Sequence, residues 1–396
     1  MIIAIDGYEA NELNRVGVGR YAFEILKHMF EYFKTHDVGR KTQDKTRFRI
    51  YLPEPPLPDM PAETPWWHYR IVQPKKLWTL FRLPLALSSD QPRADVIFSP
   101  THYIPRFTSI PRVMAIMDLS YLVYTELFRR KDIHQLIHWT RYSAFHAKKI
   151  LTISKFSRDA IIREYARSPE DVVVTYPGLS MKQEAGSKKP FVVPVSTGTP
   201  QGKQEAEVRK KYGLNNNYIL SVGTLQPRKN YVRLIEAFSM LKRKNPDLSL
   251  AIVGKKGWLY EEILEAPRTF HVAESVRFLD FVAGEDLPDL YRHAVCFALP
   301  SLYEGFGLPV LEAMAEGTIV VTSNVSSLPE VAGSAGIYVD PMNIESIKKG
   351  LEQAVTEKGT DEGDLRAAAG RKQAKQFSWE KAAQETLRVL EEVAGK

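Results

Sequence analysis

The sequence predicts an α/β protein with two domains, each built on a doubly wound parallel sheet. Three observations predict this class. The chain has 396 residues, which is more than one hydrophobic core usually organises. Short apolar runs alternate with segments of helical periodicity, a pattern typical of parallel sheets covered by helices. The alternation stops near the middle of the chain and then begins again, so we expect one domain on each side of the break.

The first series of elements lies within residues 1–180. Its predicted strands are short apolar runs that end in polar or turn-forming residues: 1–6, 48–53, 95–100, 112–118, 149–154 and 172–178. Helical spacing of apolar residues follows the first strand and recurs in 132–147 and 155–166. The proline-rich residues 53–65 are expected to form a surface loop. These elements predict a Rossmann-like N-terminal domain over 1–180.

The second series follows residues 181–208, a stretch rich in Lys, Gln, Gly, Ser and Pro that is predicted to be a linker or mobile loop. The predicted strands are 218–223, 248–254, 276–282, 296–301 and 318–323, and the helices between them are 231–244, 286–294 and 308–317. A second Rossmann-like domain is therefore expected over 209–375. Residues 376–396 are expected to form an amphipathic helix that returns to the N-terminal domain. Open α/β sheets bind ligands beyond the carboxyl ends of their strands, so we expect the site in a crevice across which the two domains face each other.

The excess positive charge lies in the first half of the chain. Residues 1–185 contain 27 Lys and Arg against 20 Asp and Glu, whereas residues 186–396 contain 27 of each. This asymmetry predicts an anionic partner for the first half: lipid head groups, a phosphate-bearing acceptor or nucleic acid. The alternative is a surface whose charge only keeps the protein soluble.

Three features predict a cytoplasmic protein. With 44% apolar and 26% charged residues, the composition is that of a water-soluble globular chain, and no window of ~20 apolar residues could span a bilayer. The first ten residues lack the basic start and apolar run of a signal peptide. The single cysteine, Cys296, lies in an apolar run and is expected to be a buried, inert thiol.

The most informative segment is EGFGLPVLEAMAEG, residues 304–317. It follows the predicted strand 296–301 and carries two carboxylates, Glu304 at the strand-to-helix turn and Glu312 two helical turns later. The amide groups near Gly305, Phe306, Gly307 and Leu308 would lie at the positive end of the helix, where an anion such as a diphosphate binds. A carboxylate beside that anion makes chemical sense if it accepts hydrogen bonds from sugar hydroxyls. The alternative is an ordinary helix with two surface glutamates.

A second segment, VGTLQPRKN over 222–230, follows the strand 218–223. Its adjacent cations Arg228 and Lys229 are placed on the loop between a strand and a helix, where they could neutralise a diphosphate. The alternative is a solvated basic turn. Both segments follow strands of one parallel sheet, so we expect them at the same edge of that sheet, and this strengthens the functional interpretation of each.

These residues resemble the donor domain of the retaining glycosyltransferases usually grouped as family 4, which have the GT-B fold. The resemblance covers nearly the whole chain. It rests on the Glu-x7-Glu signature and on the runs GVGRY (17–21), SKFSRDAI (154–161), PRKN (227–230) and SLPEVAGSAGIYVDP (327–341). The PRKN loop is similar to that of members that are often mannosyltransferases of surface polysaccharide assembly.

The resemblance implies roles for individual residues. Lys229 and Arg228 would bind the donor diphosphate and Glu304 would hold hydroxyls of the donor sugar. Glu312 would hold the ribose, and the backbone near Phe281 and Val282 would meet the base. Gly17 and Gly19 would allow the first loop to approach the diphosphate from the other domain, where a Cβ would obstruct it.

Two positions depart from the family pattern. Many members have an arginine where this chain has Thr224, and Arg228 is expected to supply that charge. Many have His-Asp where this chain has Met117-Asp118, so the acceptor side is less well defined. Asp118 is a candidate for sugar or acceptor contact, with a helix-capping role as the alternative. His102 could replace the missing histidine, with a purely structural role as the alternative.

Other motifs are excluded by spacing. GVGRYA (17–22) lies too far beyond the first strand for a dinucleotide fingerprint, and GTPQGK (198–203) has too few residues for a phosphate-binding P-loop. HQLIH (134–138) lacks the glutamate of a zinc hydrolase. No Asp-x-Asp pair suits a nucleotide-bound metal, so no metal and no further cofactor are expected. The basic, aromatic residues around 129–149 are candidates for contact with an anionic membrane or a lipid-linked acceptor, or form a solvated helix face.

The sequence therefore predicts transfer of a hexosyl group from a nucleotide sugar, a GDP- or UDP-sugar, to a glycan or lipid-linked acceptor with retention of configuration. GDP-mannose is the favoured donor on the resemblance of the PRKN loop. The expected location is the cytoplasm, including its membrane face, and no nucleic acid partner is expected. Two alternatives stay open: a sugar-nucleotide-binding protein with impaired catalysis, and a nucleic-acid-binding protein.

Overall fold

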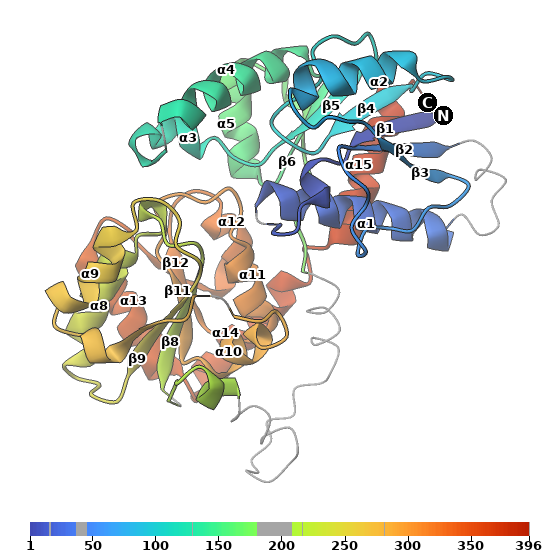
Figure 1. The fold of residues 1–396 in the computed structure, drawn as a ribbon. Helices are drawn as coiled ribbons and strands as arrows, with labels where there is room; N and C mark the ends of the chain where they lie inside the picture. The colour runs from blue at the N-terminus through green and yellow to red at the C-terminus, as the bar shows by residue number, and fades with distance from the viewer. Residues whose placement is uncertain are drawn as a thin grey trace. The chain divides into compact units, whose positions relative to one another are not determined.

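The computed structural model describes residues 1–15, 17–36, 46–128, 130–179, 208–215, 217–280 and 282–395. The chain divides into two compact units, Met1–Gly178 with Ser378–Lys396, and Leu179–Phe377. Each unit is built around one parallel sheet (Figure 1). The predicted linker over 181–208 lies outside the described residues except for its last residue.

The first unit contains a seven-stranded sheet in the order β3-β2-β1-β4-β5-β6-β7. All neighbouring strands are parallel. The strands are β1 (Ile2–Asp6), β2 (Arg47–Leu52), β3 (Trp67–Ile71), β4 (Val96–Ser99), β5 (Arg112–Ile116), β6 (Lys149–Thr152) and β7 (Val172–Val174). Because consecutive side chains of a strand point to opposite faces, a sheet with apolar runs of this kind must be covered on both sides.

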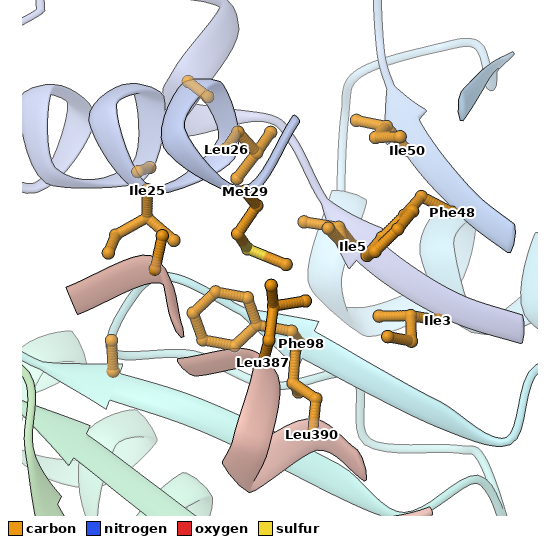
Figure 2. Close-up of a cluster of buried hydrophobic side chains, with 14 of the residues drawn as sticks. Ile3, Ile5, Ile25, Leu26, Met29, Phe48, Ile50, Phe98, Leu387 and Leu390 are labelled. Carbon is orange, nitrogen blue, oxygen red and sulfur yellow. The ribbon is translucent and has the colours of Figure 1, made fainter. Parts of the chain in front are cut away.

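Helices α1 (Val18–His36) and α15 (Trp379–Val393) cover one face of this sheet (Figure 1). Figure 2 shows Ile25 and Met29 of α1, Leu387 of α15 and Phe98 of β4 in one apolar cluster. Alternate strand residues face the other way, where α2 (Leu83–Ser89), α4 (Arg130–His146) and α5 (Lys155–Tyr165) lie. The last helix of the chain thus completes the core of the first unit.

The second unit contains a six-stranded parallel sheet in the order β10-β9-β8-β11-β12-β13. The strands are β8 (Tyr218–Val222), β9 (Ser249–Val253), β10 (Val276–Phe278), β11 (Cys296–Leu299), β12 (Val320–Ser323) and β13 (Gly336–Val339). Strand order reverses between β8 and β11, which are neighbours in the sheet although they are far apart in sequence. In open α/β sheets, this is the position at which ligands bind.

Helices cover both faces of the second sheet (Figure 1). One set packs with the larger apolar cluster: α8 (Tyr231–Lys242), α9 (Glu261–Thr269) and α13 (Ile344–Glu357). The other set comprises α10 (Leu287–His293), α11 (Leu308–Ala315), α12 (Leu328–Ala332) and α14 (Asp361–Ala374). Cys296 is buried in β11, and burial raises the pKa of its thiol to about 12. This agrees with the expectation of an inert side chain.

Candidate active site

Two loops at the carboxyl end of the second sheet form one connected structure. The chain leaves β8 at Val222 and makes a short 3-10 turn, η5 (Pro227–Lys229), before α8 begins. Asn230, in the left-handed backbone region, follows that turn, and its side-chain amide donates to the carbonyl oxygens of Pro300 (2.9 Å) and Pro341 (2.7 Å). The amide of Leu302 donates to the Arg228 carbonyl at 2.9 Å. The loop after β8 is thereby fixed against the loop after β11.

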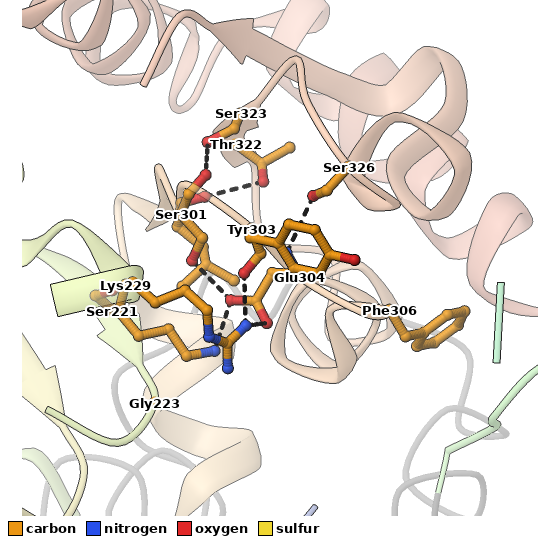
Figure 3. Close-up of polar contacts among 12 residues, drawn as sticks. Ser221, Gly223, Lys229, Ser301, Tyr303, Glu304, Phe306, Thr322, Ser323 and Ser326 are labelled. Atoms are coloured by element: carbon orange, nitrogen blue, oxygen red, sulfur yellow. Dashed lines mark hydrogen bonds and ion pairs between the residues drawn. The ribbon is translucent and has the colours of Figure 1, made fainter. Parts of the chain in front are cut away.

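Glu304 lies at the centre of this structure (Figure 3). Lys229 Nζ donates to its Oε1 at 2.6 Å, and Arg228 Nη1 donates to its Oε2 at 3.0 Å. Ser301 Oγ donates to Oε1 at 2.7 Å. Lys229 and Glu304 are buried, with 7% and 5% of their surfaces exposed. The sequence placed the two cations and Glu304 at one sheet edge, and the structure brings them into direct contact.

The charges of the two cations decide the ionisation of Glu304. Burial alone would raise the pKa of this carboxyl, but Lys229 and Arg228, with the hydrogen bonds from Lys229 and Ser301, outweigh burial and lower the pKa to about 2. The buried Lys229 and Glu304 and the half-buried Arg228 therefore form a cluster of two positive charges and one negative charge. Such a cluster retains a net positive charge toward an incoming anion.

The observed pairing refines the role given to Glu304. Its oxygens accept three hydrogen bonds from protein groups, and a carboxylate offers about four lone-pair directions. In the structure the carboxylate thus holds Arg228 and Lys229 side by side, and contact with sugar hydroxyls stays a prediction.

The loop between β11 and α11 is held by two serines that the sequence did not single out. Ser326 Oγ accepts from the Glu304 amide at 3.1 Å, and the single Ser327 hydroxyl lies within donating distance of two carbonyl oxygens, those of Glu304 and Phe306, both at 2.9 Å. Gly307 has φ +105°, and a Cβ there would lie 2.8 Å from Leu328 Cδ2. Helix α11 then begins at Leu308 with Pro309 in its first turn, which directs its positive end toward this loop.

The other predicted donor residues lie on or near the same edge. Glu312 is buried in α11, where Tyr291 Oη donates to its Oε2 at 3.0 Å. Thr224 is half-buried in the loop after β8, and Val282 is buried beyond β10. Phe281 lies outside the described residues. Gly305 and Phe306 belong to the loop before α11, and Phe306 packs edge-on against Phe377 with ring centroids 5.4 Å apart.

In the first unit, Gly17 directly precedes α1 and Gly19 lies in the first turn of that helix. Gly17 has φ +52°, which favours glycine, and a Cβ there would meet no atom within 4 Å. A Cβ on Gly19 would lie 3.0 Å from the Glu9 carbonyl oxygen. Glycine at position 19 is therefore favoured by this close contact within the unit, which the sequence could not show. Approach of either glycine to a diphosphate stays a prediction.

His102 follows β4 and lies close to Met117 and Asp118, which follow β5. The Met117 amide donates to His102 Nε2 at 3.3 Å, and the Met117 side chain is buried in the hydrophobic cluster of the first unit. Burial lowers the pKa of His102, an effect that the charge of Asp118 partly offsets. Asp118 Oδ1 accepts from the Ser120 amide at 2.8 Å at the start of α3 (Ser120–Val123). These contacts match the structural alternatives for His102 and Asp118, and acceptor contact stays a prediction for all three residues.

Within the described residues, no group of three or more His, Cys, Asp and Glu side chains is placed to hold a metal ion. In the same residues no helix has the length and apolar character needed to cross a bilayer.

Known proteins with similar sequences identify the family of the chain. Residues 204–376 match the family model described as Glycosyl transferases group 1. The chain is 33% identical to the O-antigen chain mannosyltransferase B of Escherichia coli, over 94% of each chain. It is also 36% identical over 176 residues to the serotype-specific mannosyltransferase WbdA of E. coli, an alignment that spans 43% of this chain and 21% of that protein.

Solved structures show the same architecture. Sucrose-phosphate synthase from Thermosynechococcus elongatus superposes with a TM-score of 0.73 at 16% identity, covering 99% of this chain and 98% of that one. Anabaena HepE in complex with UDP and glucose superposes with a TM-score of 0.69 at 18% identity, covering 98% of each chain. The predicted fold, two Rossmann-like parallel-sheet domains of GT-B type, is confirmed. The chain belongs to the group 1 glycosyltransferases.

Proposed function

We propose that this glycosyltransferase moves a mannosyl group from GDP-mannose to a glycan or lipid-linked acceptor, with retention of the anomeric configuration. The observation that carries the proposal is the contact of Arg228 and Lys229 with Glu304 at the carboxyl ends of β8 and β11. A nucleotide sugar presents a diphosphate, and two adjacent cations at this edge, the buried Lys229 and the half-buried Arg228, suit it. The mannosyl assignment is supported by the names of the E. coli relatives, which are mannosyltransferases.

The chemistry assigned to these residues is electrostatic. As the bond between the anomeric carbon and the phosphate oxygen breaks, the electron pair stays on the diphosphate, whose negative charge grows. Lys229, Arg228 and the positive end of α11 stabilise that charge, and they are already held in place before the reaction by Glu304, Ser301 and Asn230. Preorganised groups of this kind need no rearrangement in the transition state.

The acceptor hydroxyl forms the new bond to the anomeric carbon on the face that the phosphate leaves. Its proton passes to the departing phosphate oxygen, so the step balances without a side-chain base. Asp118 is proposed to contact the acceptor or sugar, and Glu312 the ribose. Exclusion of water during the step would limit hydrolysis of the donor.

A donor screen tests the proposal. The melting temperature of the protein is measured with GDP-mannose, GDP-fucose, UDP-glucose and UDP-galactose, because a ligand that binds the native state raises it by mass action. GDP-mannose is expected to give the largest increase, and NMR of the transferred sugar should show the α anomer of the donor retained. A larger increase with the UDP-sugars would reassign the donor. No increase with any nucleotide sugar would overturn the proposed function.

A further inference from the structure

A single carboxylate holds the segment 208–214, which leads into β8, against the loop after β10. Asp286 ends that loop and is buried, with 9% of its surface exposed. Its Oδ2 accepts hydrogen bonds from Lys211 Nζ at 2.6 Å and from Tyr212 Oη at 2.7 Å. The Tyr212 hydroxyl also accepts from the Ala283 amide at 3.4 Å. We call the three side chains of Lys211, Tyr212 and Asp286 the Asp286 cluster.

The Asp286 cluster holds a short turn at the start of α10. The amides of Asp286 and Leu287 both donate to the Ala283 carbonyl, at 3.0 and 3.2 Å, and close this turn. The Tyr212 hydroxyl contacts both ends of the turn, the Ala283 amide and the Asp286 carboxylate. Val282, near which the sequence placed the base, is buried directly before the turn. The cluster therefore restrains the backbone that follows Val282.

Helix α10 connects the same turn to the second carboxylate of the Glu-x7-Glu signature. Tyr291 of α10 is fully buried and donates to Glu312 Oε2 at 3.0 Å, and its carbonyl oxygen accepts from Thr318 Oγ1 at 2.7 Å. Arg292 Nη2 donates to Glu316 Oε2 at 2.6 Å, which joins α10 to the end of α11 as well. The Asp286 cluster thus holds the first residues of a helix whose later residues orient Glu312.

We propose that the Asp286 cluster positions the groups that recognise the nucleoside of the donor, its ribose and base. This inference rests on the proposed function, in which Glu312 contacts the ribose. Two connections lead from the cluster to the nucleoside: the turn that follows Val282, and the contact of Tyr291 with Glu312. Groups that bind a ligand need such support from residues behind them that do not touch it.

The contact of the two cations with Glu304 takes no part in these connections, because it joins the loops after β8 and β11 instead. Loss of the cluster should therefore weaken recognition of the nucleoside and leave recognition of the diphosphate unchanged. A cluster that only stabilised the fold would affect both alike. Ligands that carry one part or the other separate these two cases.

Calorimetric titrations of the full chain with GDP, GMP and inorganic pyrophosphate test the inference. The variant Tyr212→Phe removes the hydroxyl that contacts Asp286 and Ala283. It should bind GDP and GMP roughly fivefold more weakly than the wild type, and pyrophosphate with unchanged affinity. In the transfer reaction the KM for GDP-mannose should rise by a similar factor while kcat stays the same.

Two variants of Asp286 and one control accompany this measurement. Asp286→Asn keeps an oxygen that can accept from Tyr212 and should retain most of the wild-type affinity for GDP. Asp286→Ala removes that oxygen and should bind GDP as weakly as Tyr212→Phe. Tyr338→Phe is the matched control, because Tyr338 lies on β13, at the sheet edge opposite β10, and donates to the Pro329 carbonyl. This control is expected to bind all three ligands like the wild type.

Two results for Tyr212→Phe overturn the inference. One is an unchanged affinity for GDP. The other is an equal loss of affinity for GDP and pyrophosphate, which indicates a general loss of structure. A wild type that binds pyrophosphate as tightly as GDP would also overturn it and would leave the diphosphate site standing. A wild type that binds none of the three ligands would overturn the proposed function, and this inference with it.

Discussion

Two buried carboxylates, one in each unit, lie at the carboxyl ends of parallel strands and yet differ sharply in ionisation. Glu304 follows β11 and has a pKa lowered to about 2, because Lys229 and Arg228 outweigh the effect of burial. Asp6 ends β1 and has a pKa raised to about 7, because burial dominates over the hydrogen bonds from Trp78 Nε1 (2.9 Å) and the Tyr8 amide (3.2 Å). Burial is similar for both, so cationic partners decide the difference.

The two units therefore place different kinds of groups at the carboxyl ends of their strands. In the second unit, opposite charges are gathered and fixed, which suits a site that receives a charged diphosphate. In the first unit, Asp6 and His102 are buried with few charged partners, and the neutral form of each is favoured. Substitutions in each unit, with effects first on turnover and then on stability, test whether the two units differ in this way.

The largest effect is expected for Lys229→Ala. Lys229 is assigned to the growing charge on the diphosphate, so turnover of the donor should fall by roughly 10³-fold while circular dichroism shows an intact fold. Lys244→Ala is the control, because Lys244 forms an exposed pair with Glu352 in the same unit. Unchanged turnover in Lys229→Ala would remove this lysine from the site.

Glu304→Gln is expected to lower stability in a pH-dependent way. The pKa of Glu304 is lower in the folded chain than its ordinary value of 4.5, so its ionised form stabilises the fold above pH 4.5, and this contribution is lost as the pH falls toward 2. The wild type should exceed the variant by about 3 kcal/mol in the free energy of unfolding near neutral pH, and the difference should shrink in acid.

Denaturant unfolding at several pH values measures this difference. Glu345→Gln serves as control, since Glu345 forms an exposed pair with Lys348 and should have little effect. A Glu304→Gln variant as stable as the wild type at neutral pH would show that the buried pairing does not stabilise the second unit.

Asp6→Asn should give the opposite pH dependence. The pKa of Asp6 is raised in the folded chain from 3.8 to about 7, so the wild type loses stability as the pH rises from about 4 to about 7. The variant lacks this loss and keeps an oxygen that can accept from Trp78. Relative to the wild type, it should gain on the order of 4 kcal/mol between pH 4 and pH 8 by thermal or chemical unfolding. Parallel stability profiles for the two proteins would contradict the raised pKa.

The smallest effects are expected from two glycines. Gly307→Ala adds a Cβ against Leu328 at a positive φ and should cost about 2 kcal/mol, whereas Gly17→Ala has open space and should cost about 1 kcal/mol. Melting temperatures of both variants provide the comparison. A larger cost for Gly17→Ala would show that the loop before α1 is more constrained than its surroundings indicate.

Much of the fold followed from the sequence because its strands are short apolar runs that end in polar residues. β3 was missed, since four of its five residues are at least partly exposed and it follows a proline-rich loop. β13 was missed because it lies within a run of small residues, with glycine at its start. Edge strands with a weak apolar pattern are therefore hard to recognise from the sequence.

The candidate site could be predicted only in part. The sequence identified Arg228, Lys229 and Glu304 by residue type and position after strands. The two cations were assigned to the diphosphate and Glu304 to the sugar hydroxyls. Their direct contact could not be predicted, because nothing in the sequence shows that β8 and β11 are neighbours and that their loops touch. Ser301 and Asn230 carried no signal, since serine and asparagine are common in loops.

Recognition of a diphosphate by Lys229 and Arg228 underlies the chemistry assigned to the second unit. Calorimetry with GDP and GMP on the wild type and on Lys229→Gln measures this recognition. The wild type is expected to bind GDP at least about tenfold more tightly than GMP, and the variant should lose most of that preference while binding GMP unchanged. An equal preference for GDP in both proteins would contradict the account.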